Sequence, residues 1–138
     1  MYLYSTSKQQ RTRNHCDTIY RDGVYIFRFS RPTRRAVDEW LLALDTAYRS
    51  HPVDRPLRMV IDYRLRGMPQ LSYATQRARH WLYANPDAPQ THLVLLHKSD
   101  ALATIIDGVV RLLRTPNLNI RFFHESREED ALAWLREQ

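Results

Sequence analysis

The sequence predicts an α/β protein with a mixed, mostly parallel sheet of four to five strands and about four helices. Two observations predict this fold class. Short apolar runs alternate with longer segments of helical periodicity, and the links between them are short. The run at residues 57–61 is apolar at nearly every position, which is typical of a central strand covered on both faces. The expected order is β-β-α-β-α-β-α-β-α, with right-handed crossovers.

The pattern opens with a hairpin and a long helix. Residues 17–20 and 24–29 have strand-like composition, and Asp22-Gly23 between them is a strong signal for a tight hairpin turn. Apolar residues at three- and four-residue spacing then predict a helix over residues 34–50 with one buried face. Prolines follow this helix and separate it from the central strand.

Three further helices complete the pattern. Residues 71–84 are apolar along one face, and Ser72 stands where this helix begins, so we expect its hydroxyl to cap the helix. Residues 101–114 are apolar over a wide arc, which predicts a helix that lies deep or meets a partner. Residues 126–129, Ser-Arg-Glu-Glu, match a capping box before the last helix. The two remaining strands are expected at residues 92–97 and 118–123.

Length and charge predict one domain with a basic extension. A chain of 138 residues is normally one domain with its own core. The net charge is +6, and residues 1–35 alone hold eight basic side chains and two acidic ones. We expect residues 1–15 to be a flexible basic segment and residues 16–138 to form the domain. The lone Cys16 is expected to be buried on a strand.

The expected location is the cytoplasm. No apolar run approaches the roughly 20 residues that cross a bilayer. The first residues also lack the charged and apolar regions of a signal peptide.

Candidate binding residues gather after the central strand. Asp62 ends the strand, Arg64 and Arg66 follow in a loop, and Ser72 begins the next helix. Ligands of open α/β sheets bind in a crevice outside the carboxyl ends of the strands, so the two arginines would hold an anion there with the helix N-terminus. A solvated loop is the alternative interpretation of the arginines. Asp62 would either orient Arg64 or cap the loop.

The sequence contains none of the glycine-rich phosphate loops, dinucleotide fingerprints or nucleophile elbows that mark common enzymes. The six histidines lack the spacing of metal ligands. His97 and His124 end neighbouring strands and are expected to approach each other, which is a weak pocket signal. We therefore expect no catalytic residue, no cofactor and no metal.

Three stretches resemble a known family. Residues 60–62, Val-Ile-Asp, close the central strand before a loop and a helix. Residues 122–125, Phe-Phe-His-Glu, lead into an acidic-Ala-Leu-x-Trp-Leu pattern within residues 128–135. Together with the hairpin and long helix, these stretches resemble the SpoIIAA-like STAS domains of the anti-sigma-factor antagonists and the STAS/Sec14-related group, over about residues 17–137.

The resemblance implies a STAS-type fold and a non-enzymatic, regulatory role in bacterial signalling or stress regulation. In the antagonists a serine at the start of the helix after the central strand is phosphorylated. Ser72 is the nearest serine here and is the candidate phosphoacceptor, although the family's Asp-Ser-Ser-Gly run is absent. Sec14-related members suggest apolar ligands.

Three functions are therefore weighed. The first is binding of a partner protein through the second and third helices, with a homodimer through residues 101–114. The second is transport of a small apolar or anionic ligand at the crevice near Arg64 and Arg66. The third is nucleic-acid association through residues 1–15, Arg77 and Arg79. The expected burial of all three tryptophans, Trp40, Trp81 and Trp134, leaves no exposed aromatic platform and argues against the third.

Overall fold

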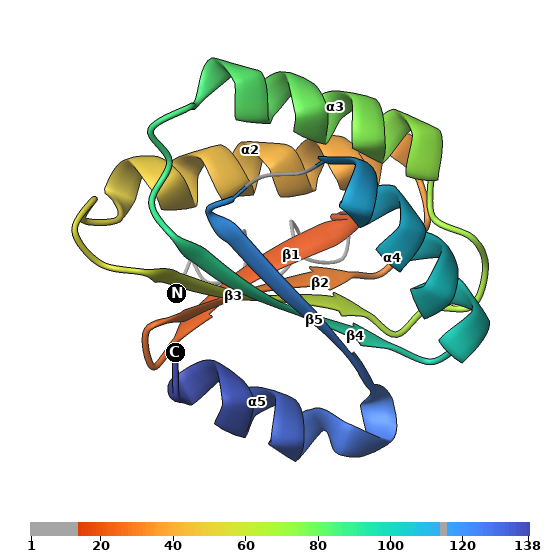
Figure 1. Ribbon diagram of the computed structural model, residues 1–138. Coiled ribbons are helices and arrows are strands. Elements are labelled where there is room, and N and C mark those ends of the chain that lie inside the picture. The colour runs from red at the N-terminus through yellow and green to blue at the C-terminus, as the bar shows by residue number, and fades with distance from the viewer. Residues whose placement is uncertain (1–13, 114–115) are drawn as a thin grey trace, which may run out of the picture.

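A computed structural model describes residues 14–113 and 116–138, and it shows a five-stranded sheet between layers of helices (Figure 1). The first two strands form an antiparallel hairpin, and all later strands run parallel to the second. The sheet order is β1-β2-β3-β4-β5, the order of the sequence. The strands are β1 (Cys16–Arg21), β2 (Val24–Phe29), β3 (Leu57–Tyr63), β4 (Thr91–His97) and β5 (Leu118–His124).

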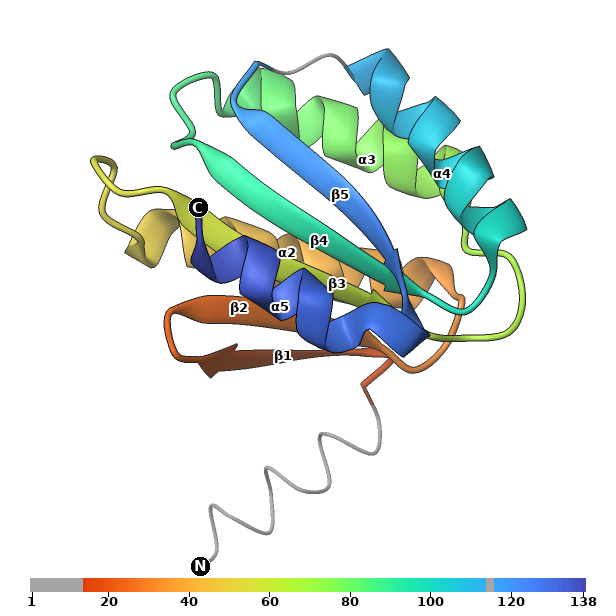
Figure 2. The ribbon, with the colours of Figure 1, turned by 60° about the horizontal axis from the view of Figure 1, so that its bottom comes forward.

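Three helices cover one face of the sheet and one covers the other (Figures 1 and 2). Because the order of the parallel strands never reverses, crossovers of one hand place all their helices on the same side. We call this side the helical face and the opposite side the α5 face. The helices are α2 (Arg34–Ser50), α3 (Leu71–Ala84), α4 (Asp100–Leu113) and α5 (Glu128–Arg136), the last preceded by the short 3₁₀ helix η1 (Glu125–Arg127). The predicted α/β class, with a mostly parallel sheet and four helices, is confirmed.

Successive side chains of each strand point to opposite faces of the sheet, so the core is divided between the two faces. On the helical face the buried cluster under α2 includes Phe27, Val37, Leu41, Leu57 and Met59. On the α5 face the buried cluster includes Val60, Val94, Leu96, Ala131 and Leu135. The central strands therefore have buried apolar side chains on both sides, as their sequence predicts.

The hairpin turn and the burial of Cys16 are also as predicted. Asp22 and Gly23 have φ angles of 53° and 78°, the left-handed values that a tight two-residue hairpin turn requires. Cys16 is buried on β1, and burial raises the pKa of its thiol to about 12. Glu39 of α2 accepts hydrogen bonds from the backbone N–H groups of His15 and Cys16, at 2.7 and 3.0 Å, which fixes the start of β1 against α2.

Two capping predictions are wrong. The N-cap of α3 is Gln70, Ser72 is already the second helical residue, and no side-chain hydrogen bond caps this end of the helix. The predicted capping box does not form either, because residues 125–127 form η1, which His124 caps by accepting from the Ser126 N–H. α2 does have a side-chain cap, since Thr33 accepts from the Ala36 N–H at 3.1 Å.

Most of the predicted flexible basic segment, residues 1–13, lies outside the described residues. Residues 14 and 15 are described, and His15 is bonded to Thr33 as well as to Glu39. Within residues 14–113 and 116–138, no helix has the length and apolar character needed to cross a membrane.

Two glycines give opposite predictions for the same substitution. A Cβ at Gly23 or at Gly108 meets no atom within 4 Å, so only the backbone decides the effect. Gly23→Ala forces alanine into a left-handed conformation and should lower the free energy of unfolding by about 1 kcal/mol. Gly108→Ala, inside α4, should raise it by about 0.5–1 kcal/mol. Urea unfolding of the two variants measures both, and equal shifts would contradict the turn conformation.

Candidate functional site

An apolar cavity of about 300 Å³ lies on the helical face, enclosed by the sheet, α2, α3 and α4 and partly open to solvent. It extends along the full inward side of α3. The helices contribute Trp40, Tyr48, Leu71, Ala74, Ala78, Trp81, Ile106, Val109 and Val110 to its lining, and the strands contribute Met59, Ile61, Leu93, Leu95 and Ile120.

The cavity exists because α3 is held above the sheet by its larger side chains. Ala74 and Ala78 face the cavity, and their short side chains leave the space beneath the helix unfilled. No residue of α3 is fully buried. Trp81 contacts Tyr48 of α2 with ring centroids 4.6 Å apart and donates a hydrogen bond to Asp45 at 3.2 Å, which anchors the C-terminal half of the helix.

The lining is uncharged: every residue that the structure places around the cavity is neutral. Several of its polar side chains are already paired. The hydroxyls of Tyr48 and Thr91 bond to each other, and the Thr75 hydroxyl donates to the Leu71 carbonyl at 2.7 Å. Trp40 differs, because its buried indole N–H has no hydrogen-bond partner among the described residues. Such a lining favours an apolar occupant with few hydrogen-bonding groups.

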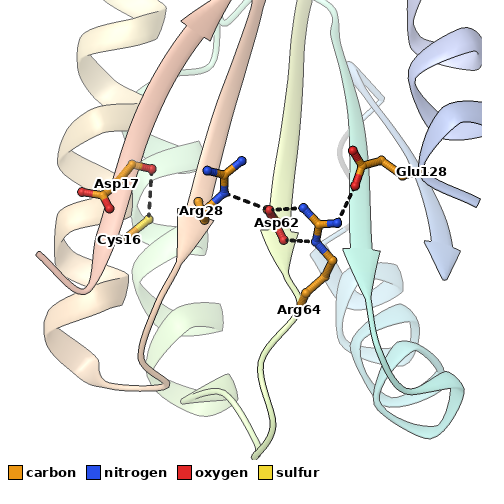
Figure 3. A network of polar contacts seen from close by, with 6 residues as sticks. All are labelled: Cys16, Asp17, Arg28, Asp62, Arg64 and Glu128. Carbon is orange, nitrogen blue, oxygen red and sulfur yellow. Dashed lines mark hydrogen bonds and ion pairs between the residues drawn. The ribbon is translucent and has the colours of Figure 1, made fainter. Parts of the chain in front are cut away.

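A second cluster of polar residues lies on the α5 face and contains two of the predicted site residues (Figure 3). Asp62 is only 3% exposed. Arg64 donates to both of its carboxylate oxygens at 2.8 Å, and Arg28 donates to one at 3.1 Å. Arg64 also pairs with Glu128, the first residue of α5. Two arginines and two carboxylates thus neutralise each other and attach α5 to the sheet.

The pKa of Asp62 reflects this arrangement. Burial alone would raise the pKa of its carboxyl group, but the hydrogen bonds from Arg64 and Arg28 outweigh burial and hold the pKa below its ordinary value. The same contact raises the pKa of Arg64. The predicted role of Asp62 in orienting Arg64 is therefore confirmed.

The predicted anion site has a different arrangement in the structure. The guanidinium of Arg64 is occupied by two carboxylates, whereas Arg66 is exposed and makes no hydrogen bond or ion pair with another described residue. Ser72 is exposed in the first turn of α3. The cavity includes only Leu71 of the segment from Asp62 to Ser72. Because the strand order never reverses, the sheet lacks the switch point where such crevices form.

The expected approach of His97 and His124 is confirmed. Their rings meet edge to face with centroids 5.8 Å apart. His97 is buried, its Nδ1 has no partner in the described part of the chain, and burial lowers its pKa. Tyr63 lies beside it on β3, and burial raises the pKa of that hydroxyl to about 12. None of these residues lines the cavity, so they do not belong to that site.

Several residues of these sites were not singled out from the sequence. Arg28 and Glu128 complete the Asp62 cluster, and only strand pairing and the position of α5 bring them there. The cavity did have a sequence signal in the small residues Ala74, Thr75 and Ala78, which share one side of α3. The predicted core positions of all three tryptophans are confirmed, since Trp40 and Trp81 pack against the core of the helical face and Trp134 against that of the α5 face.

Comparison with known proteins adds no family. No family model, no curated protein and no solved structure matches the chain.

Replacing the buried carboxylate should destabilise the fold in a pH-dependent way. Asp62→Asn leaves two arginines without their shared partner and should lower the free energy of unfolding at pH 7 by about 2–3 kcal/mol. Because the folded-state pKa is depressed, this contribution is complete above about pH 4 and is lost as the pH falls through the folded-state value. Denaturant unfolding at pH 7 and at pH 3 measures both effects.

The matched control is Asp107→Asn, which removes an exposed pair with Arg111 on α4 and should change the free energy of unfolding by less than about 0.5 kcal/mol. If Asp62→Asn behaves like this control, or if its effect is the same at both pH values, the Asp62 cluster does not stabilise the fold as described.

Proposed function

We propose that this protein is a non-enzymatic binding protein that holds a small apolar molecule in the cavity between α3, α4 and the sheet. The observation that carries the proposal is the cavity of about 300 Å³ with an entirely uncharged lining. This volume is at the lower end of the roughly 300–1,000 Å³ of small-molecule sites, whose lining is also mostly apolar and aromatic. The proposal develops the ligand-carrier alternative. It places the ligand beneath α3 instead of at the crevice near Arg64 and Arg66.

The lining offers enough contact for useful affinity. Trp40, Tyr48 and Trp81 present aromatic rings to the cavity, and aliphatic side chains of α4 face them. Each methylene group moved from water into such surroundings contributes about 0.8 kcal/mol, so a ten-carbon chain contributes about 8 kcal/mol. An association cost of about 4 kcal/mol leaves about 4 kcal/mol, which corresponds to millimolar affinity. A partly open cavity also allows exchange of the occupant with solvent.

Partner-protein binding is the second candidate, and exposed apolar side chains favour it. Tyr83 on α3 is 81% exposed, Met68 just before α3 is 53% exposed and Ile105 on α4 is 44% exposed. A regulatory, STAS-like role in the cytoplasm, with Ser72 as a phosphoacceptor, belongs to this candidate and is supported by the mostly parallel sheet and by the exposure of Ser72. Most of the wide apolar arc of α4 faces the core and the cavity and is therefore not available to a partner, because Leu102 and Ile106 are buried.

Filling the cavity should weaken ligand binding without unfolding the protein. Ala78→Leu places a larger side chain in the cavity and should weaken binding of decan-1-ol at least about tenfold, with unchanged or higher stability. Trp40 and Trp81 line the cavity, so their fluorescence reports the titration. Calorimetry gives the affinity, and native mass spectrometry of the purified protein shows any molecule already bound.

Ala133→Leu is the matched control, since it makes the same change at an exposed helical position on α5. It should bind decan-1-ol like the wild type. Unchanged affinity in Ala78→Leu, or no binding by the wild type, would contradict the proposal.

A homodimer through α4 has its own test. Among the α4 side chains that the structure describes, Ile105 is the large apolar one that is exposed, so a dimer interface there must include it. Light scattering after size-exclusion chromatography should then give a dimer for the wild type and a monomer for Ile105→Lys. A wild-type protein that stays monomeric at high concentration would rule out this interface.

A further inference from the structure

A more open groove, lined by polar as well as apolar side chains, adjoins the cavity on the outside of the molecule. It lies between α3 and α4, and we call it the outer groove. The cavity and the outer groove share three lining residues, Leu71, Thr75 and Val109. The two hollows differ in chemistry, because the cavity lining is uncharged whereas Arg79 and His80 line the outer groove.

Arg79 is available to a ligand. It makes no ion pair or hydrogen bond with another described residue, and no acidic residue lines the outer groove or occurs in α3. Arg77, two positions earlier on the same helix, is placed differently. It forms an ion pair with Asp38 and lies over the ring of Tyr73, on the side that faces α2. In the part of the chain that the structure describes, Arg79 is therefore an uncompensated positive charge beside the apolar cavity.

We propose that the natural ligand is a single-chain amphiphile with a carboxylate head group, whose chain fills the cavity and whose carboxylate binds Arg79 in the outer groove. This inference rests on the proposed function. The small volume admits one chain. The ionised head group cannot follow the chain inward, because the lining holds no charge to compensate the loss of water.

The outer groove supplies the groups that a carboxylate needs. The planar guanidinium of Arg79 can donate two parallel hydrogen bonds to its oxygens. Ser72 and Gln76 line the same groove with a hydroxyl and an amide, which are further donors. One unpaired arginine matches a singly charged head group.

The first experiment compares decanoate with decan-1-ol on the full chain by calorimetry at neutral pH and low salt. The two probes share one chain length and differ in the head group. The cavity by itself would favour the alcohol, because a carboxylate loses more free energy on leaving water. Tighter binding of decanoate than of decan-1-ol is therefore expected and reports a cationic partner.

The second experiment locates that partner. Arg79→Gln should weaken decanoate binding about tenfold and leave decan-1-ol binding unchanged. Added salt should weaken decanoate binding by the wild type and have little effect on the variant. The matched control, Arg77→Gln, removes an arginine from the same helix on the side away from the groove and should keep the preference for decanoate.

Each outcome decides between the proposals. Decan-1-ol binding as tightly as decanoate would overturn the carboxylate inference and leave the apolar cavity as the site. Decanoate preference that survives in Arg79→Gln would overturn the assignment of the head group to the outer groove. Failure of both probes to bind would overturn the proposed function together with this inference.

Discussion

The position of α3 above the sheet is the constraint on which the helical face depends. Trp81 and Tyr48 hold the C-terminal half of this helix at a distance that Ala74 and Ala78 cannot span. The hydrogen bond from Trp81 to Asp45 fixes the indole ring, so the contact has one geometry. A helix with larger inward residues would fill the same space and bury them. The cavity is therefore a consequence of side-chain size along one helix face, in a protein interior that is otherwise closely packed.

The α5 face is organised by charge instead. Asp62 is buried beneath α5, and burying a carboxylate is costly unless cations surround it. Arg64 bonds to both of its oxygens and then to Glu128, 64 positions away in the sequence, so the same interaction attaches the last helix to the central strand. The arginines that the sequence suggests as ligand contacts are in part structural. Ion pairs thus hold α5 against one face of the sheet, whereas the helical face contains the unfilled cavity.

Arg64 and Arg79 show why residue type alone does not identify a site. Arg64 follows β3 and Arg79 lies on α3, and the sequence places Arg64 at the usual ligand position of an open α/β sheet. The structure pairs Arg64 with two carboxylates and leaves Arg79 without a partner among the described residues. Charge is available for binding only where the fold brings no opposite charge to it, and that depends on strand register and helix position rather than on local sequence.

The sequence by itself determined the elements of this protein. Hydrophobic periods of two and 3.6 residues, the Asp22-Gly23 turn and the alternation of strand and helix are local properties. They predicted the α/β class and the buried faces of α2 and of the central strands, whereas the apolar face of α3 lines the cavity and has no fully buried residue. Only the tertiary structure decided where space and free charge occur. The cavity depends on α2, α4 and the sheet meeting around the small residues of α3. The Asp62 cluster depends on residues from β2, β3, the loop after β3 and α5. Such meetings are set by packing over long sequence separations, which local patterns do not encode.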